Sequence, residues 1–335
     1  MGYTCFELRF KARSPIFIGS RKIGFIQQTR RYIPGKTLWG AITSNVARKL
    51  IDEGVKYNPK VYEKVGKCIE GYVKNTYFFP EIIGQKKRNS KDTFNPSFTK
   101  EGLKYGQCSE REFESTFISS FVSTATLGSR NSAMDESLHE TEYILNKVNC
   151  KTGVKQVYWK GYLFVKEDIS GKCSVKNSEE FEEIELGYEG KSIKLLEALS
   201  EIRVGGDLRY GFGTLELCKN KVKKIEKGAS VFNWDLENTD RLIFNNGCTN
   251  EESAVSGKNF EGNPIFGHLL LNTDEIGTYR GELEPLVGRI YDSKKGFGRR
   301  LDSNGVAFVP GTCFGDKINK IELDSCGLLK FSNLD

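Results

Sequence analysis

The opening residues of the chain alternate between apolar and polar side chains. In residues 5–12, CFELRFKA, this alternation is typical of a strand that is buried on one face. A polar, hairpin-like stretch follows and ends at Pro34-Gly35. The next segment, KTLWGAITSNVARKL, places four apolar residues at helical spacing, namely Leu38, Ile42, Val46 and Leu50. The chain therefore begins with a predicted strand, loop and amphipathic helix.

The same patterns predict elements further along the chain. Residues 154–165, VKQVYWKGYLFV, are rich in β-branched and aromatic side chains, which favour a strand. Residues 192–202, SIKLLEALSEI, space their apolar positions for a helix, and TLEL at 214–217 is typical of a strand. Between 52 and 116 the pattern is mixed: YEKVGKCIEGYVKNTYFF fits either a helix or a strand, and the polar residues 85–112 predict a long loop or insertion.

The composition indicates a soluble, cytoplasmic protein. With 335 residues, of which 38% are hydrophobic, the chain is long enough for one large domain or two ordinary ones. No window approaches the roughly 20 apolar residues of a membrane span, and the N-terminus does not resemble a secretion signal. Nine scattered cysteines without a CxxC pair, and only two histidines, predict free thiols in a reducing compartment. We expect no metal site, no cofactor and no membrane contact.

The distribution of charge is more informative than its sum. A net charge of +6 is too small to require a polyanionic partner. However, basic residues gather beside glycines or in predicted loops at three places: Arg30, Arg31 and Lys36; Lys86, Lys87, Arg88 and Lys91; Lys294, Lys295, Arg299 and Arg300. One such cluster would be an ordinary solvated surface, but three beside glycine-rich turns favour anion binding.

The segment RYIPGKTLWG, residues 31–40, is similar to a nucleotide-binding loop but fails its spacing. A P-loop requires a glycine five residues before Gly35, where this chain has Arg30. A second interpretation is that the free N–H groups at the start of the helix, together with Lys36, attract a phosphate that does not belong to ATP. A plain helix entry remains the alternative.

Residues 203–217, RVGGDLRYGFGTLEL, contain a glycine-rich loop. Its four glycines provide backbone freedom and no side chain to pack, and they alternate with two arginines and a tyrosine: Arg203, Gly205, Gly206, Arg209, Tyr210, Gly211 and Gly213. Backbone donors, cations and a stacking ring are the groups that hold a single-stranded nucleic acid. A dinucleotide-binding fingerprint is excluded, because a strand rather than a helix follows the loop.

A weak internal echo indicates two related lobes. YIPGKTLWG at 32–40 is similar to FVPGTCFG at 308–315, and YGFGTLEL at 210–217 is similar to KGFGRRL at 295–301. The second lobe is expected to begin near residue 226, after the basic stretch KNKVKKIEK.

Three segments, in this order, resemble the RAMP (repeat-associated mysterious protein) superfamily of CRISPR effector subunits. They are SPIFIGSRKIGFIQQTRRYIPGKTLWGAI; RNSAMDESLHETEYIL at 130–145 with the strand YWKGYLFV after it; and RVGGDLRYGFGTLEL. Lys36 and Trp39 stand where the superfamily often has a small hydroxyl residue and an arginine.

The resemblance implies an α+β fold of tandem ferredoxin-like (RRM-like) domains, in which antiparallel sheets carry helices on one face. Residues 1–225 would form a ferredoxin-like RAMP domain with insertions, and residues 226–335 a smaller, ferredoxin-like lobe. The chain is most similar to the two-lobed subunit of type III effector complexes that grips the 5′ handle of the CRISPR RNA. The partners implied are CRISPR RNA, the large polymerase-nuclease subunit and the backbone subunits.

Two catalytic alternatives stay open. A repeat-RNA endoribonuclease would use a histidine to activate the 2′-hydroxyl; His139 is the candidate, whereas His268 lies in an apolar run typical of a core. A backbone subunit that cleaves target RNA with a metal ion would use Asp135 or Asp207, although aspartates in such positions commonly cap helices or form turns.

The favoured interpretation is a non-catalytic RNA-binding subunit. The residues expected to contact RNA are Arg30, Arg31, Gly35, Lys36, Arg203, Gly205, Gly206, Arg209, Tyr210, Gly211, Gly213, Lys294, Lys295, Arg299 and Arg300.

Overall fold

The computed structural model describes eight stretches of the chain: residues 2–83, 93–128, 132–151, 153–246, 262–271, 277–292, 296–315 and 318–332. The side chains of residues 289–292, 297–300 and 302 lie outside this description. Within the described stretches, no helix is long and apolar enough to cross a membrane.

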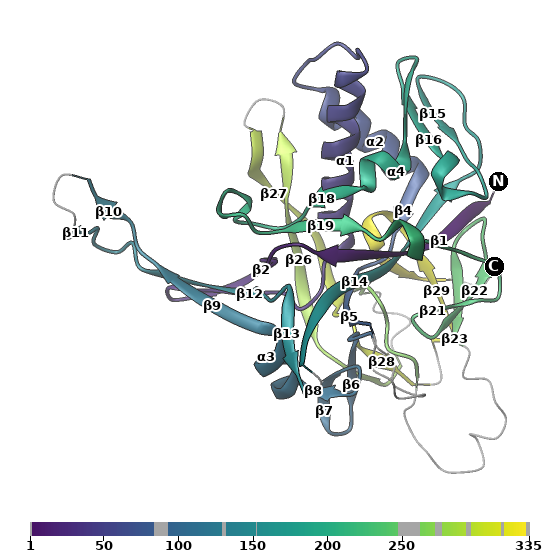
Figure 1. Ribbon diagram of the computed structural model, residues 1–335. Coiled ribbons are helices and arrows are strands. Elements are labelled where there is room, and N and C mark those ends of the chain that lie inside the picture. The colour runs from purple at the N-terminus through teal and green to yellow at the C-terminus, as the bar shows by residue number, and fades with distance from the viewer. Residues whose placement is uncertain are drawn as a thin grey trace, which may run out of the picture.

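An antiparallel sheet built by the first 225 residues runs through the centre of the molecule (Figure 1). Its strands follow the order β13-β14-β1-β19-β18, with β4 and β5 on the free edge of β14 and β20 beside β1. Their bounds are β1 (Tyr3–Ala12), β4 (Val73–Asn75), β5 (Phe79–Ile82), β13 (Lys147–Cys150), β14 (Gly153–Lys166), β18 (Glu201–Arg203), β19 (Thr214–Leu217) and β20 (Lys223–Ile225). The strands expected at 5–12, 154–165 and 214–217 are confirmed.

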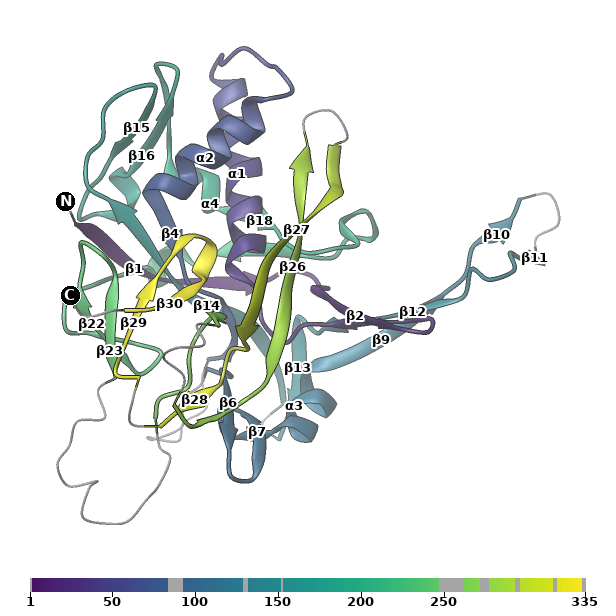
Figure 2. The ribbon, with the colours of Figure 1, turned by 180° about the vertical axis from the view of Figure 1, so that it is seen from behind.

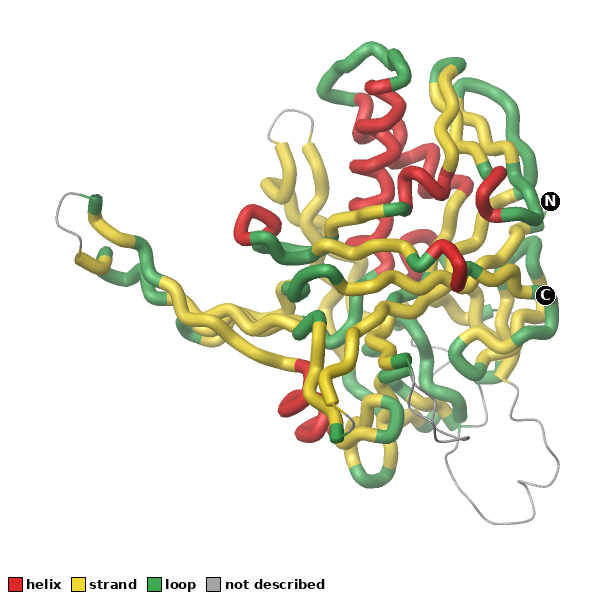
Figure 3. Tube along the Cα trace, viewed as in Figure 1, coloured by secondary structure: helices red, strands yellow, loops and turns green. Residues whose placement is uncertain are grey.

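The path of the chain through this sheet is ferredoxin-like. It runs from β1 through a helix to β4 and β5, then through β14 and a second helix to β19, and β1 lies between β14 and β19. The helices α1 (Gly35–Asp52), α2 (Val61–Tyr72) and α4 (Leu195–Leu199) lie together on one side of the sheet (Figure 3). The helix expected after Pro34-Gly35 is confirmed as α1, and its four predicted core residues are buried. The first lobe therefore has the expected α+β arrangement.

The helix expected at 192–202 is shorter than predicted. Only Leu195–Leu199 are helical, because strand pairing captures the residues on both sides. Ile193 pairs with Leu186, and Ile202 pairs with Leu215. These residues belong to a small sheet of β15 (Cys173–Lys176), β16 (Glu185–Tyr188) and β17 (Lys191–Lys194), and to β18. Tertiary pairing overrides the helical spacing here.

A second eight-stranded sheet, almost entirely antiparallel, follows in the order β21-β22-β23-β29-β30-β24-β27-β26 (Figure 2). Its strands are β21 (Ser230–Val231), β22 (Trp234–Asn238), β23 (Ile243–Asn246), β24 (Leu269–Leu270), β26 (Leu283–Asp292), β27 (Gly296–Phe308), β29 (Lys320–Leu323) and β30 (Leu329–Phe331). The described part of this lobe contains the 3-10 turn η5 (Ser325–Gly327) and no α-helix. The predicted boundary between residues 225 and 226 stays a prediction.

Short elements complete the fold. They are the small sheet of β6 (Pro96–Thr99), β7 (Gly102–Tyr105) and β8 (Cys108–Ser109), the helix α3 (Glu110–Phe117), and the pair β25 (Tyr279–Arg280) and β28 (Cys313–Phe314). A capping box between Ser109 and Glu112 starts α3. The polar residues 85–112, for which the sequence predicted a long loop or insertion, therefore include three strands and the start of a helix in their described part, residues 93–112.

Both faces of the first sheet are covered, although the alternation in residues 5–12 predicted one solvated face. Phe6, Leu8 and Phe10 pack toward the helices, whereas Cys5 joins a core shared with the second lobe. On β14, Phe164 belongs to that shared core as well. The second lobe takes the place of solvent, which sequence alternation cannot reveal.

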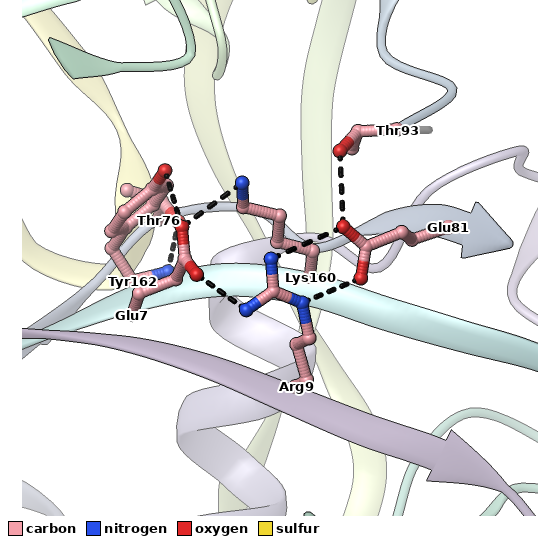
Figure 4. Close-up of polar contacts among 7 residues, drawn as sticks. All are labelled: Glu7, Arg9, Thr76, Glu81, Thr93, Lys160 and Tyr162. Atoms are coloured by element: carbon pink, nitrogen blue, oxygen red, sulfur yellow. Dashed lines mark hydrogen bonds and ion pairs between the residues drawn. The ribbon is translucent and has the colours of Figure 1, made fainter. Parts of the chain in front are cut away.

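Charged residues on this covered face neutralise one another (Figure 4). Arg9 Nε donates to Glu81 Oε2 at 2.7 Å, and Lys160 Nζ lies 2.9 Å from Glu7 Oε2. The hydroxyl of Tyr162 donates to the same Glu7 oxygen at 3.2 Å. Burial opposes ionisation of Glu7, but Lys160 and Arg9 still lower the pKa of its carboxyl. Glu7 and Arg9 of β1 thus belong to an ion network in which two carboxylates face two cations.

A second buried network joins the two lobes. Arg30 of the first lobe donates to Glu284 of β26 at 2.7 Å and to the Tyr32 hydroxyl at 2.8 Å. Nε2 of His268, in the second lobe, lies 2.5 Å from the same Glu284 oxygen, and its Nδ1 lies 2.7 Å from the Tyr77 hydroxyl. A carboxylate accepts only, so Nε2–H donates to Glu284 while Nδ1 accepts from Tyr77. A neutral imidazole therefore satisfies both partners.

The protonation of this network follows from its burial. Burial is the main reason that the pKa of His268 is lowered, although Glu284 opposes the effect. For Glu284, burial opposes ionisation, yet the hydrogen bond from His268 and the charge of Arg30 lower its pKa to about 2. At neutral pH the lobes are thus joined by a neutral histidine, a carboxylate and a guanidinium.

Replacing His268 by Gln is expected to make the free energy of unfolding depend less on pH on the acid side of neutrality. The folded chain resists protonation of His268 while the unfolded chain does not, so the free energy of unfolding should fall as pH drops below the ordinary histidine value of 6.5. Urea unfolding at a series of pH values measures the slope, with His139→Gln as the matched histidine control. An unchanged slope in His268→Gln would contradict the assignment.

The structure joins Cys68 of α2 and Cys173 of β15 in a disulfide, with Cα atoms 5.9 Å apart. The expectation that all cysteines are free is therefore wrong for this pair. The two residues are 105 positions apart, so spacing along the chain gave no sign of their proximity. The other cysteines in the described stretches are free.

Cys68→Ser is expected to lower the free energy of unfolding by about 2–4 kcal/mol in oxidising buffer, because the crosslink restricts the unfolded chain. A reducing agent should make wild type and variant equally stable. Cys218→Ser removes a half-buried free thiol and is the control. Urea unfolding with and without reductant provides the measurement, and a wild-type protein unaffected by reductant would argue against the crosslink.

Candidate nucleic-acid interface

A four-stranded sheet projects sideways from the body of the molecule (Figures 1 and 2). Its order is β2-β3-β12-β9, with bounds β2 (Gly19–Ile23), β3 (Ile26–Thr29), β9 (Ile118–Ser123) and β12 (His139–Ile144). The short pair β10 (Thr126–Leu127) and β11 (Ser132–Ala133) extends it outward. We name the four strands the arm sheet. It joins the polar hairpin near the N-terminus to the segment 130–145 by a parallel pairing of β3 with β12.

Strand register gives the arm sheet two chemically different faces. Residues paired directly across neighbouring strands lie on the same face. One row holds Lys22, Gln27, Thr141 and Phe121, and the pairs Tyr143–Ser119 and His139–Ser123 lie on the same side. We name this side the basic-aromatic face. The adjacent row holds Ile23, Ile26, Glu140 and Val122, with the pair Glu142–Ser120 beside it, and forms the acidic face.

The glycine-rich loop between β18 and β19 is exposed. Arg203 and Arg209 are exposed, and 75% of Tyr210 is accessible to solvent. The turn η2 (Leu208–Tyr210) lies between Asp207 and Gly211, both of which have positive φ. Each of these three side chains, which were expected to contact RNA, is thus on the surface.

The glycines of this loop serve different purposes. Gly205 and Gly213 have φ of +83° and +81°, and a Cβ at either position would collide with a backbone carbonyl, that of Phe17 or Val204. These two glycines let the loop pack closely against the backbone of Phe17 and Val204. Gly211, with φ of +87°, would have no atom within 4 Å of its Cβ and remains an open turn.

Phe212 attaches the loop to the arm sheet. Its ring centroid lies 5.6 Å from that of Phe121 and 5.3 Å from that of Tyr143, with interplanar angles of 39° and 31°. Both partners belong to the basic-aromatic face. All three rings are half-buried, so the cluster is reachable from solvent. The loop and the basic-aromatic face therefore form one continuous surface.

The basic cluster at the entry of α1 is turned inward. Arg30 is bound in the network between the lobes, and Arg31 pairs with Glu114 of α3. A Cβ at Gly35 would collide with the carbonyl of Cys326, so the helix entry packs closely on η5. Lys36 Nζ lies near β26, at 3.3 Å from the position of a Cβ on Gly288. The structure thus gives Arg30, Arg31 and Gly35 partners within the protein, and their contact with RNA stays a prediction.

Several expected residues lie outside the described parts of the chain. These are Lys294 and Lys295, and the cluster of Lys86, Lys87, Arg88 and Lys91. Arg299 and Arg300 belong to β27, but their side chains are not described. The third basic cluster therefore remains a prediction from sequence.

The candidates for catalysis are dispersed. His139 is half-buried on the basic-aromatic face, with Nδ1 3.0 Å from the Ser137 carbonyl oxygen. Asp135 lies in an exposed turn near the outer end of the arm, and Asp207 precedes η2 in a left-handed conformation. His268 is only 1% exposed, which confirms the expectation that it is a core residue.

Sequence reasoning missed Lys22 and the aromatic pair Phe121 and Tyr143. Lys22 is exposed on β2, inside the stretch SRKIGFIQQT that was described only as polar. Alternation in that stretch could have indicated which side chains share a face. The parallel pairing that aligns them with β12 could not be foreseen.

Comparison with known proteins identifies the family. The model of the RAMP superfamily matches residues 9–216. Similar chains occur in cryo-EM structures of the type III-B Cmr-beta: bound to cognate target RNA and AMPPnP (9% identity, TM-score 0.48, 92% of this chain and 86% of that chain covered), bound to cognate target RNA (11%, 0.48, 93% and 87%), and in the apo state (11%, 0.36, 66% and 97%). No curated protein sequence matches significantly. The match covers more than half of the 335 residues of the chain, and the chain therefore belongs to the RAMP superfamily.

Proposed function

We propose that this chain is a non-catalytic CRISPR RNA-binding subunit of a type III effector complex, and that it grips the 5′ handle of the guide RNA. Membership of the RAMP superfamily supports the class of protein. The observation that carries the proposal is the glycine-rich loop, which exposes Arg209 and Tyr210, follows the exposed Arg203 of β18 and contacts the arm sheet through Phe212.

The mechanism is positional. The two guanidinium groups neutralise successive phosphates, and the Tyr210 ring offers its face to an unpaired base. The tight packing of Gly205 and Gly213 holds these groups on a fixed turn, so little conformational entropy is lost when RNA binds. Most of the affinity comes from the phosphate backbone and therefore decreases with salt.

The neighbours of this subunit are the other proteins of the complex, including the large polymerase-nuclease subunit and the backbone subunits. This follows from the resemblance of its motifs to the two-lobed member of the superfamily. We also propose that residues 1–225 and 226–335 are its two lobes and that it acts in the cytoplasm.

The double replacement of Arg203 and Arg209 by Ala is expected to weaken binding of repeat-derived RNA. If each arginine contacts one phosphate of a single strand, the slope of log affinity against log salt should decrease by about 1.4 in magnitude. Stability should change by less than about 0.5 kcal/mol, because both side chains are exposed. Filter binding at several salt concentrations measures the slope.

The matched control replaces Lys56 and Lys60, two exposed lysines between α1 and α2, by Ala. It removes the same charge from another surface and should leave the slope nearly unchanged. If the loop variant binds RNA as tightly as wild type, the glycine-rich loop is not part of the RNA interface.

The endoribonuclease alternative is retained because His139 lies on the basic-aromatic face of the arm sheet. A subunit that only binds should leave repeat RNA intact with or without Mg²⁺, and His139→Ala should change nothing. Gel analysis of end-labelled RNA decides the matter. A discrete, metal-independent cut that disappears in His139→Ala would make the chain an enzyme, and a Mg²⁺-dependent cut of target RNA lost in Asp135→Asn would make it a backbone-type nuclease.

A further inference from the structure

The arm sheet separates two kinds of surface with a single layer of strands. On one face, the exposed Lys22 and half-buried His139 flank the aromatic cluster of Phe121, Tyr143 and Phe212. On the opposite face, Glu140 and Glu142 line a polar cavity with Glu114. Successive residues of each strand point to opposite faces, so the strand register determines which side chains a polyanion would meet on each face.

Electrostatics favours one face for RNA. The cavity on the acidic face holds three carboxylates, and its guanidinium, that of Arg31, is paired with Glu114. A phosphate placed there would meet like charge. The other half of the acidic face exposes Ile23 and Val122, at 59% and 61%, which offer no group to a phosphate. The basic-aromatic face has neither obstacle.

The aromatic cluster supplies the chemistry for a base. The centroids of Phe121 and Tyr143 lie 6.1 Å apart with a 44° tilt, and Phe212 leans against both. Stacking on an aromatic ring tolerates any base, because every base has a π-face. Phe212 belongs to the same loop as Tyr210, so a strand held at Tyr210 is already beside the cluster.

We propose that the RNA leaves the glycine-rich loop along the basic-aromatic face of the arm sheet, stacks an unpaired base on the Phe121–Tyr143–Phe212 cluster, and passes its phosphates near Lys22. This inference rests on the proposed function and extends it with a second binding surface. The acidic face does not contact the RNA.

Neighbouring residues of β9 test the choice of face. Ser123 pairs with His139 and lies on the basic-aromatic face, whereas Val122 pairs with Glu140 and lies on the acidic face. The photo-crosslinker p-azidophenylalanine is introduced at one position or the other in the full chain. Each protein is mixed with radiolabelled repeat-derived RNA and illuminated, and filter binding in the dark confirms that both still bind RNA.

Crosslinked RNA from the Ser123 variant, and none above background from the Val122 variant, is the expected result, although Val122 is the more exposed position. Crosslinking from Val122, or from neither position while RNA is bound, overturns the inference and leaves the proposed function intact. If neither variant nor the wild-type chain binds the RNA, both the inference and the proposed function are wrong.

A second readout uses Phe212→Leu, which keeps an apolar side chain to hold the loop on the arm but removes the stacking ring. RNA with 2-aminopurine in its unpaired 5′ segment should lose fluorescence quenching with this variant at saturating protein. The control is Tyr57→Leu, which removes an exposed ring from the loop between α1 and α2. Equal quenching in Phe212→Leu and wild type would overturn the stacking assignment.

Discussion

The pairing of β1 with β14, two strands covered on both faces, is the constraint on which the rest of the structure depends. Helices cover one side and the second lobe covers the other, so the buried side chains of the pair have to be either apolar or neutralised. Glu7, Arg9 and Lys160 meet this condition only because Glu81 of β5 completes their network. Removing a single member would leave a buried charge without a partner, which costs far more than the net value of the ion pairs.

The need to neutralise buried carboxylates also determines which cationic side chains remain available for a polyanion. Arg9 and Arg31 are held by carboxylates, and Arg30 serves the junction between the lobes. The net charge of +6 is therefore a poor guide to binding, because part of the positive charge has a structural use. Arg203, at the end of β18, and Arg209, in the turn η2, differ from these residues in being exposed.

Local sequence patterns predicted those elements that depend mainly on residues close together in the sequence. The spacing of Leu38, Ile42 and Val46 was sufficient to place α1, and the glycines of residues 203–213 correctly indicated an exposed turn. The misjudged features depend on distant partners. Arg30 meets Glu284 across 254 positions, so its structural partner could not be read from a local window, and its contact with RNA stays a prediction. Likewise, the ends of the predicted helix at 192–202 were lost to strands that no local window contains.

The distance along the chain between β1 and β14 has a consequence for synthesis. Tyr3–Ala12 are translated well before their longest pairing partner, Gly153–Lys166. Until then the first strand lacks its partner for backbone pairing and exposes the apolar side chains of Phe6, Leu8 and Phe10, a state prone to wrong association. Shielding of the nascent first strand is therefore expected to raise the yield of native protein in a cell.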